Sequence, residues 1–209
     1  QAIAAAEGLP SGAHRRLRES LLPIAQQRLG VALRLQGRFA EAESLLREAL
    51  IGADRKHGYQ SRLAIKTQIN LGLAIQAQGR YADADKQLRE ALARVPAVTD
   101  SETLELDMDA RTRLGRLQIQ VGNHVEAESL LETAIRESVG DGQQVMRWRQ
   151  MAFDGLAMLR NQQRRHGESL SYARRSAELV APAWGERHSN TMNAYANLAK
   201  SLFKLGQLD

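Results

Sequence analysis

The side chains of this chain that could do chemistry include two pairs of glutamates. Two carboxylates held close together can act as a general acid and a general base, and Glu41 with Glu43 and Glu126 with Glu128 have the necessary composition. The two pairs recur, however, at the same position of an internal sequence repeat that is described below. Such recurrence is typical of the solvated outer side of a helix, so we assign these glutamates no catalytic role.

Metal-ligand and nucleophile patterns are missing from the sequence. There is no cysteine, which excludes a disulfide framework, a thiolate zinc site and a cysteine nucleophile. No two of the 5 histidines have the i, i+3 or i, i+4 spacing that places two imidazoles on one helix face. The sequence also contains no glycine-rich phosphate loop and no nucleophile elbow. We therefore predict no enzyme activity, no cofactor and no metal site, and we expect His188 to help a helix begin.

Arginine clusters could bind phosphate groups, and the net charge of the 209-residue chain is +5. The clusters are Arg15, Arg16 and Arg18; Arg147 and Arg149; Arg164, Arg165 and His166; and Arg174 and Arg175. Acidic residues are interleaved through most of the chain, and aromatic residues, which stack on bases, make up only 4% of it. Nucleic-acid binding is therefore the third of the functions that we consider.

The elements that would position these side chains are helices. Alanine, leucine, arginine, glutamine and glutamate dominate the composition, and runs of β-branched residues are absent, so we predict an all-α fold. No stretch approaches the roughly 18 continuous apolar residues of a membrane span. Residues 1–10 lack the basic start and the apolar core of a signal peptide. Because the first residue is glutamine, we expect a piece of a larger, cytoplasmic protein.

An internal repeat organises the chain. Similar segments begin at leucines that recur in steps of 42 or 43 residues, at Leu29, Leu71, Leu114, Leu156 and Leu198. In four of the five repeats a glycine follows each leucine by eight residues, where a left-handed residue would end the first helix. In the first three repeats, Ala-x-x-x-Leu-x-x-Ala then places three apolar residues on one stripe of a second helix. We expect Ala42, Ala84 and Ala127, which open these patterns, to be almost fully buried.

The recurring Leu-Gly, Gly-x-aromatic and Ala-x-x-x-Leu-x-x-Ala pattern resembles the tetratricopeptide repeat, whose usual unit has about 34 residues. The longer period resembles the repeats of kinesin light chains and of many bacterial regulatory proteins, and the segment from Trp184 to His188 is similar to that subclass. The resemblance covers roughly residues 23–209. It implies a right-handed α-solenoid of helix-turn-helix repeats, about four and a half units long.

We predict one solenoid domain over residues 1–209. Its parts are an N-terminal helical lead-in and five repeats, at 1–22, 23–64, 65–107, 108–149, 150–191 and, truncated, 192–209. The helices are predicted at 13–36, 40–57, 60–78, 82–95, 101–121, 124–138, 143–163, 168–181 and 190–205. Glycines and prolines separate them, with Pro182 marking the end of the eighth helix and Pro23 either kinking the first helix or opening a new one.

The fourth and fifth repeats depart from the pattern. Arg164 stands where the other repeats have glycine, and Ser169 stands where the first three have alanine. Because arginine tolerates a positive φ poorly, we expect the fourth hairpin to turn differently and its repeat to be the least stable. A terminal repeat needs a polar cap, so we expect four apolar residues to be partly uncovered or covered by another chain: Leu198, Leu202, Phe203 and Leu205.

In an array of this family the first helices line the concave surface. The candidate partner-binding residues are the polar and cationic first-helix residues that packing does not require: Arg28, Arg34, Lys66, Asn70, Arg113, Arg116, Asn161, Asn193, Asn197 and Lys200. In the family, such residues bind a peptide backbone or carboxylate, and the match by position is clearest for Lys66, Asn70, Arg113 and Asn197. We expect these side chains to be partly accessible and not paired with Asp109 or Asp154.

These observations favour a module that binds a protein or peptide through its concave surface. The module would be the C-terminal or sensor part of a larger bacterial regulatory protein, such as a signalling ATPase, a transcription regulator or a Ser/Thr kinase. The first alternative is an oligomerisation module that pairs through its terminal helices, above all the uncapped C-terminal one. The second alternative is a nucleic-acid-binding solenoid. No membrane interaction is expected.

Overall fold

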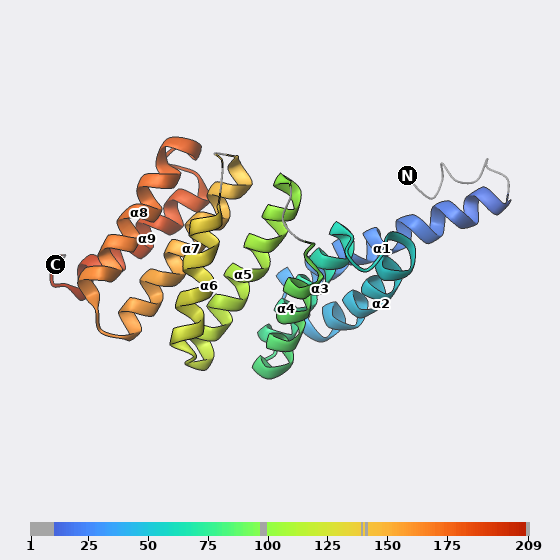
Figure 1. Ribbon diagram of the computed structural model, residues 1–209, viewed down its shortest axis with the longest axis horizontal. Helices are drawn as coiled ribbons and strands as arrows, with labels where there is room; N and C mark the ends of the chain where they lie inside the picture. The colour runs from blue at the N-terminus through green and yellow to red at the C-terminus, as the bar shows by residue number, and fades with distance from the viewer. Residues whose placement is uncertain (1–10, 97–99, 139, 141, 208–209) are drawn as a thin grey trace. The chain divides into compact units, whose positions relative to one another are not determined.

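The computed structural model describes residues 11–96, 100–138, 140 and 142–207. These residues form helices joined by short turns, and no strand occurs among them (Figure 1). The all-α prediction is therefore confirmed. The helices are α1 (Ser11–Leu35), α2 (Phe39–His57), α3 (Arg62–Ala77), α4 (Tyr81–Arg94), α5 (Ser101–Val121), α6 (His124–Glu137), α7 (Gln143–Gln162), α8 (His166–Trp184) and α9 (Ser189–Lys204).

The chain divides into two compact units. The first, Gln1–Ala97, contains α1 to α4, and the second, Val98–Asp209, contains α5 to α9. Within each unit, α1, α3, α5 and α7 each pack against the second helix of their own repeat, and consecutive repeats are in contact, with α9 packing on α8 and α7. The prediction of one continuous solenoid domain over residues 1–209 stays a prediction.

The turn inside each repeat has the same backbone conformation. The glycines at this position have φ of +80°, +78°, +86° and +67° at Gly37, Gly79, Gly122 and Gly206. Arg164 adopts the same left-handed conformation, with φ of +59°. The Arg165 N–H donates to the Arg160 carbonyl (2.8 Å), as the Arg38 N–H donates to the Leu33 carbonyl (2.9 Å) in the first repeat.

The prediction that the fourth hairpin turns differently is therefore wrong. The hydrogen bond across the turn and the packing of the two flanking helices fix the conformation, and Arg164 adopts it. A non-glycine residue in the left-handed region costs roughly 1–2 kcal/mol. The expectation that the fourth repeat is the least stable stays a prediction, and the backbone at Arg164 is the physical reason for it.

Close contact between the two helices of a repeat explains the small residues of the pattern. Ala42, Ala84 and Ala127 are completely buried, which confirms the prediction. A Cβ on Gly30 would lie 2.6 Å from the Cγ of Leu46, a distance that real Cβ atoms essentially never show. The leucine of the second helix thus occupies the space that the glycine of the first helix leaves free.

In the fourth repeat, different residues make the close contact between the two helices. Ala157 stands at the position of Gly30, and Ala173 stands at the position of Leu46, so a larger residue on α7 faces a smaller one on α8. Both alanines are buried. Ser169 is also fully buried, and its hydroxyl donates to the Ala157 carbonyl (2.9 Å). The serine is therefore hydrogen-bonded where it replaces an alanine.

The helix ends agree with the predicted ends to within two residues, with one exception. Helix α8 continues past Pro182 to Trp184, because the proline lies in the last turn, where its missing N–H removes only one helical hydrogen bond. Pro23 lies inside α1, so the long helix is continuous there. The Nδ1 of His188 accepts a hydrogen bond from the Asn190 N–H (3.2 Å), which confirms its predicted place at the start of α9.

Candidate partner-binding surface on the first helices

The four candidate residues of the first compact unit lie on its two first helices. Arg28 and Arg34 are on α1, and Lys66 and Asn70 are on α3. Arg28 is exposed, whereas the other three are half-buried. The Asn70 Nδ2 donates to the Lys66 carbonyl (2.8 Å), so one donor of this amide is used within its own helix. Within the described residues, this is the one hydrogen bond of the Asn70 side chain.

Arg113 on α5 differs from the expectation. Its Nε donates to the carboxylate of Asp109, one helical turn earlier, and its guanidinium lies 5.4 Å from the ring centroid of Trp148. The prediction that Arg113 is not paired with Asp109 is therefore wrong. The physical reason is their i, i+4 spacing, which makes opposite charges neighbours on one helix face.

Three other polar residues come together from successive first helices of the second compact unit. Asp154 on α7 accepts a hydrogen bond from the Ser176 hydroxyl of α8 (2.8 Å), and the side chain of Asn197 on α9 hydrogen-bonds the same carboxyl group. Arg116 on α5 interacts electrostatically with Asp154. The expectation that the candidate residues are not paired with Asp154 is therefore wrong for Asn197. We call Arg116, Asp154 and Asn197 the first-helix cluster.

The first-helix cluster is half-buried, and burial dominates its electrostatics. Burial raises the pKa of the Asp154 carboxyl above its usual range, although the hydrogen bonds from Ser176 and Asn197 and the charge of Arg116 oppose the rise. Burial likewise lowers the pKa of the Arg116 guanidinium, which Asp154 partly offsets. Among the described residues Arg116 has no hydrogen-bond partner, so its donors are available for a ligand.

The backbone of α7 lies close to its neighbours at this cluster. A Cβ on Gly155 would lie 2.9 Å from the Cδ1 of Leu131 and 3.6 Å from the Cγ of Arg116. The cluster therefore offers the donors of a guanidinium, the acceptors of a carboxylate and one amide on adjacent helices. This combination can hydrogen-bond both the N–H and the C=O groups of a peptide.

The remaining candidates of this unit are not part of the cluster. The Oδ1 of Asn161 lies 3.1 Å from the Nδ1 of His166, at the turn between α7 and α8. Asn193 and Lys200 are exposed on α9. No interaction within the described part of the chain joins these three residues to Arg116, Asp154 or Asn197.

Glu43 and Glu128 have a function in the structure that sequence reasoning missed. Glu43 accepts hydrogen bonds from Gln78 (2.7 Å) and Arg80 (2.9 Å) of the second repeat, and its side chain is only 13% exposed. Glu128 of the third repeat forms a bidentate ion pair with Arg160 of the fourth. The interpretation of these two residues as solvated is therefore wrong, because they join consecutive repeats. The detectable signal was Arg160, a cation at a position that is apolar in the first two repeats.

The basic clusters of the sequence are partly used inside the protein. Arg149 donates to the Ser138 hydroxyl (2.9 Å) and carbonyl (2.8 Å), and the guanidinium of Arg147 lies 5.3 Å from the ring centroid of Trp148. The side chains of Arg15, Arg16 and Arg18 lie outside the described residues.

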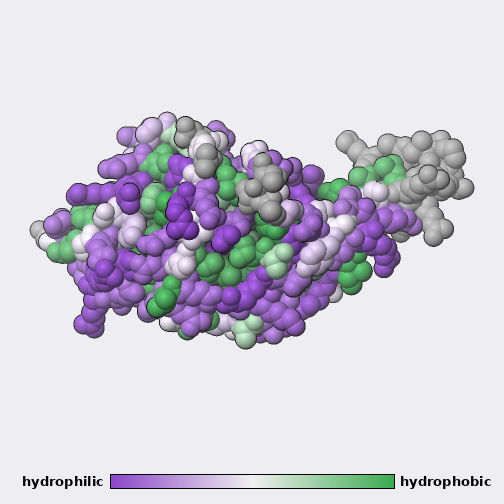
Figure 2. All heavy atoms as spheres, viewed as in Figure 1, coloured by the Kyte–Doolittle hydropathy of each residue, from purple (hydrophilic) through white to green (hydrophobic). Residues whose placement is uncertain are grey.

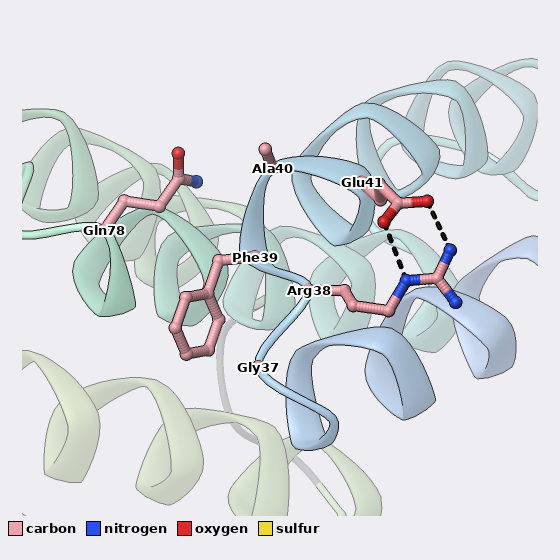
Figure 3. Close-up of a pocket in the computed structure, with 6 residues that line it drawn as sticks. All are labelled: Gly37, Arg38, Phe39, Ala40, Glu41 and Gln78. Carbon is pink, nitrogen blue, oxygen red and sulfur yellow. Dashed lines mark hydrogen bonds and ion pairs between the residues drawn. The ribbon is translucent and has the colours of Figure 1, made fainter.

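A shallow hollow of the first compact unit lies at the turn between α1 and α2 (Figure 3). Arg38 and Glu41 form an ion pair at its rim, with 2.7 Å between Nε and Oε1. None of the ten candidate residues lines this hollow, so we assign it no function. Its lining residues are Gly37, Arg38, Phe39, Ala40, Glu41 and Gln78.

Within the described ranges, His, Asp and Glu residues nowhere gather in a group of three or more that could hold a metal ion. No helix of the described part is both long and apolar enough to cross a membrane. In the space-filling view most of the visible surface is hydrophilic, with hydrophobic residues in smaller patches (Figure 2).

Comparison with known proteins gives two family matches, both to models described as tetratricopeptide repeat. One match covers residues 13–97 and the other residues 108–133, so together they cover more than half of the chain. A comparison with curated protein sequences gave no match.

Several solved structures are similar to this one. BtubC (BKLC) from P. vanneervenii has a TM-score of 0.71 at 18% identity and covers 99% of this chain and 81% of its own. A protein of Podosopora anserina described as a kinesin light chain with nearly identical TPR-like repeats has a TM-score of 0.67 at 18% identity. That comparison covers 90% of this chain and 89% of the other. The predicted all-α solenoid of helix-turn-helix repeats is thereby confirmed.

Proposed function

Because the chain belongs to the tetratricopeptide repeat family, whose repeats generally mediate protein–protein interaction, we propose that it binds an extended peptide segment of a partner protein on its first helices. The observation that carries this proposal is the first-helix cluster. Arg116, Asp154 and Asn197 come from three successive first helices, α5, α7 and α9, and they remain partly accessible. An extended chain crossing these helices would meet one of the three side chains on each.

The balance of charges around the first-helix cluster favours recognition of the peptide backbone. Arg113 is neutralised by Asp109, and Arg116 faces Asp154, so this part of the surface has no large excess of positive charge. A strongly acidic ligand would gain little there, whereas a peptide group can bond Arg116 through its oxygen and Asp154 through its N–H. The module is proposed to act in the cytoplasm, as the partner-binding part of a larger bacterial regulatory protein.

A peptide library displayed on phage and selected against the whole chain tests the proposal. The dissociation constants of selected peptides are then measured for Arg116→Met and Asn197→Ala. Each change should weaken binding by about tenfold, because truncating one hydrogen-bonding partner typically costs about 1–3 kcal/mol. Arg47→Ala and Glu132→Ala on the outer sides of α2 and α6 are the controls. If the controls abolish binding and the first-helix variants do not, the proposed surface is wrong.

Self-association is the second candidate function, and the surface of α9 favours it. Apolar residues on this helix are exposed: Met192 (56%), Tyr195 (36%), Phe203 (64%) and, just after it, Leu205 (36%). At the positions of Met192 in the second and third repeats, Ile65 and Met108 are fully buried. Sedimentation velocity across a concentration series tests this function. A dimer that Met192→Ser and Phe203→Ser dissociate would support it, and a monomer at all concentrations would exclude it.

A further inference from the structure

Helix α8 lacks an acidic residue that the other second helices carry. Glu43, Asp85 and Glu128 occupy one position of the repeat on α2, α4 and α6, and on α8 this position is Leu170, which is buried. One turn later, α2 and α4 carry an arginine that pairs with this acid. The Arg47 Nη2 lies 2.7 Å from the Glu43 Oε1, and the Arg89 Nε lies 2.7 Å from the Asp85 Oδ2.

Arg174 occupies the position of Arg47 and Arg89, and the replacement of the acid by Leu170 removes the ion-pair partner that those two arginines have. It is exposed, and it has no ion pair or hydrogen bond within the part of the chain that the structure describes. Its neighbour Arg175 is exposed as well, and the guanidinium lies 5.4 Å from the ring centroid of Phe153. This contact limits the freedom of the Arg175 side chain.

Arg164, in the turn before α8, is a second departure of the same repeat. It is exposed and takes part in no ion pair between described residues. Its φ of +59° is the only positive φ of a non-glycine residue in the described ranges, at a position where the other repeats have glycine. Backbone strain of this kind is found preferentially where a side chain serves binding or catalysis.

Arg174 and Arg175 lie on one side of α8, and Arg164 lies in the turn that precedes this helix. Residues 167, 171, 174, 175 and 178 share a face of α8 at helical spacing. Gly167 and Ser171, which precede Arg174 on this face, are small and exposed. The part of α8 from His166 to Arg174 is about 12 Å long, a length that a short peptide segment can match.

Two acidic residues of the same helix bear on the net charge of this side. Glu168 is already paired with Arg165 (2.6 Å) and with Arg160 (3.1 Å). Glu178 lies one turn beyond Arg174 and forms no ion pair with it. The positive charge of Arg164, Arg174 and Arg175 therefore exceeds the acidic charge on the face.

We propose that Arg164, Arg174 and Arg175 form a second binding surface, on the outer side of α8, for an acidic segment of a partner protein. This surface is separate from the first-helix cluster and does not depend on it. A protein segment fits better than a nucleic acid, because the face has no exposed aromatic residue on which bases could stack. Arginine suits carboxylate groups, since its planar guanidinium can form two parallel hydrogen bonds with them.

The test measures binding of a fluorescein-labelled 12-residue peptide, rich in glutamate, to the whole chain by fluorescence anisotropy at low salt. Arg174→Glu with Arg175→Glu should weaken binding by about tenfold or more, because attraction becomes repulsion. Arg47→Glu with Arg89→Glu is the matched control. It changes the net charge equally, at the same exposed position of α2 and α4, and it should leave the affinity within about twofold.

Arg164→Gly gives an independent readout. It should weaken peptide binding by about two- to fivefold, the effect expected for one exposed ion pair, while it raises the thermal midpoint by relieving the backbone. Equal weakening by the α8 pair and the control pair would overturn the proposal, since only net charge would then matter. Binding of single-stranded DNA more tightly than the peptide, with the same loss in the α8 variant, would overturn the assignment to a protein partner.

Discussion

Glu128 on α6 and Arg160 on α7 form a bidentate ion pair that joins the third and fourth repeats. Arg160 is only 4% exposed and also lies 3.1 Å from Glu168 of its own repeat. Glu43 makes the corresponding link between the first and second repeats through Gln78 and Arg80. In both places a carboxylate of one second helix is bound by polar side chains of the following repeat.

Removing the carboxylate should therefore destabilise the protein more than replacing the arginine. Glu128→Gln leaves the buried guanidinium of Arg160 with only Glu168 as a charged partner, and we expect a loss of about 1–3 kcal/mol in the free energy of unfolding. Arg160→Met, which replaces the cation by an apolar chain of similar length, should cost less. Urea unfolding of the two variants checks the order. A larger loss for Arg160→Met would contradict the account.

The pH dependence of stability should have opposite signs at Glu128 and Asp154. The hydrogen bond from Arg160 lowers the pKa of Glu128, so its contribution is complete above the unfolded pKa of about 4.3 and is lost as the pH falls through the lower folded pKa. Burial raises the pKa of Asp154, so acidification from the raised folded pKa down to about 3.9 should stabilise the folded state.

Unfolding free energies of the wild type, Glu128→Gln and Asp154→Asn between pH 3 and 7 separate these effects. The advantage of the wild type over Glu128→Gln should shrink at the acidic end. The advantage of Asp154→Asn over the wild type should be greatest at neutral pH and should also shrink on acidification. Parallel curves for all three proteins would show that neither carboxyl group has the environment described above.

The packing of Gly72 against Leu88 should behave as a coupled pair. A Cβ on Gly72 would lie 3.0 Å from the Leu88 Cγ, so Gly72→Ala should destabilise despite the better helix propensity of alanine. The double variant Gly72→Ala, Leu88→Ala reproduces the Ala157 and Ala173 arrangement of the fourth repeat. We expect it to lose less stability than the sum of the single variants, with a coupling of about 0.5–3 kcal/mol. Strict additivity in urea unfolding would contradict this packing.

The fourth repeat should open more readily than the second. Hydrogen exchange should be faster over residues 160–172 than over residues 79–91, because Arg164 holds a left-handed conformation that glycine holds in the other repeats. Arg164→Gly should slow exchange in the first window and stabilise the protein by about 1 kcal/mol. Equal protection of the two windows in the wild type would show that the strain is structurally neutral.

Much of the fold could be predicted because the repeat is local. The positions of Ala42, Ala84 and Ala127, the glycine turns and most helix ends follow from patterns within about 25 residues. The predicted end of α8 before Pro182 was wrong, because a proline in the last turn of a helix removes one hydrogen bond without ending the helix. The predicted change of the turn at Arg164 was wrong, because the packing of the whole hairpin fixes the turn and the preference of one residue does not.

The candidate site was less predictable because it depends on which side chains meet across helices. The sequence places Arg113 and Asp109 one turn apart, but only the structure shows that they pair. It gives no sign that Asp154 is shared by Ser176 and Asn197. Glu128 resembled a solvated residue, because its partner Arg160 lies 32 residues away in the chain.

The most direct test of the central proposal is to map where a bound peptide touches the protein. Cross-saturation NMR on the whole chain, with a protonated library-selected peptide and deuterated protein, reports the contacted amides. The proposal predicts the strongest transfer to α5, α7 and α9 around Arg116, Asp154 and Asn197. Transfer confined to the outer sides of the second helices, or to the exposed apolar face of α9, would contradict it.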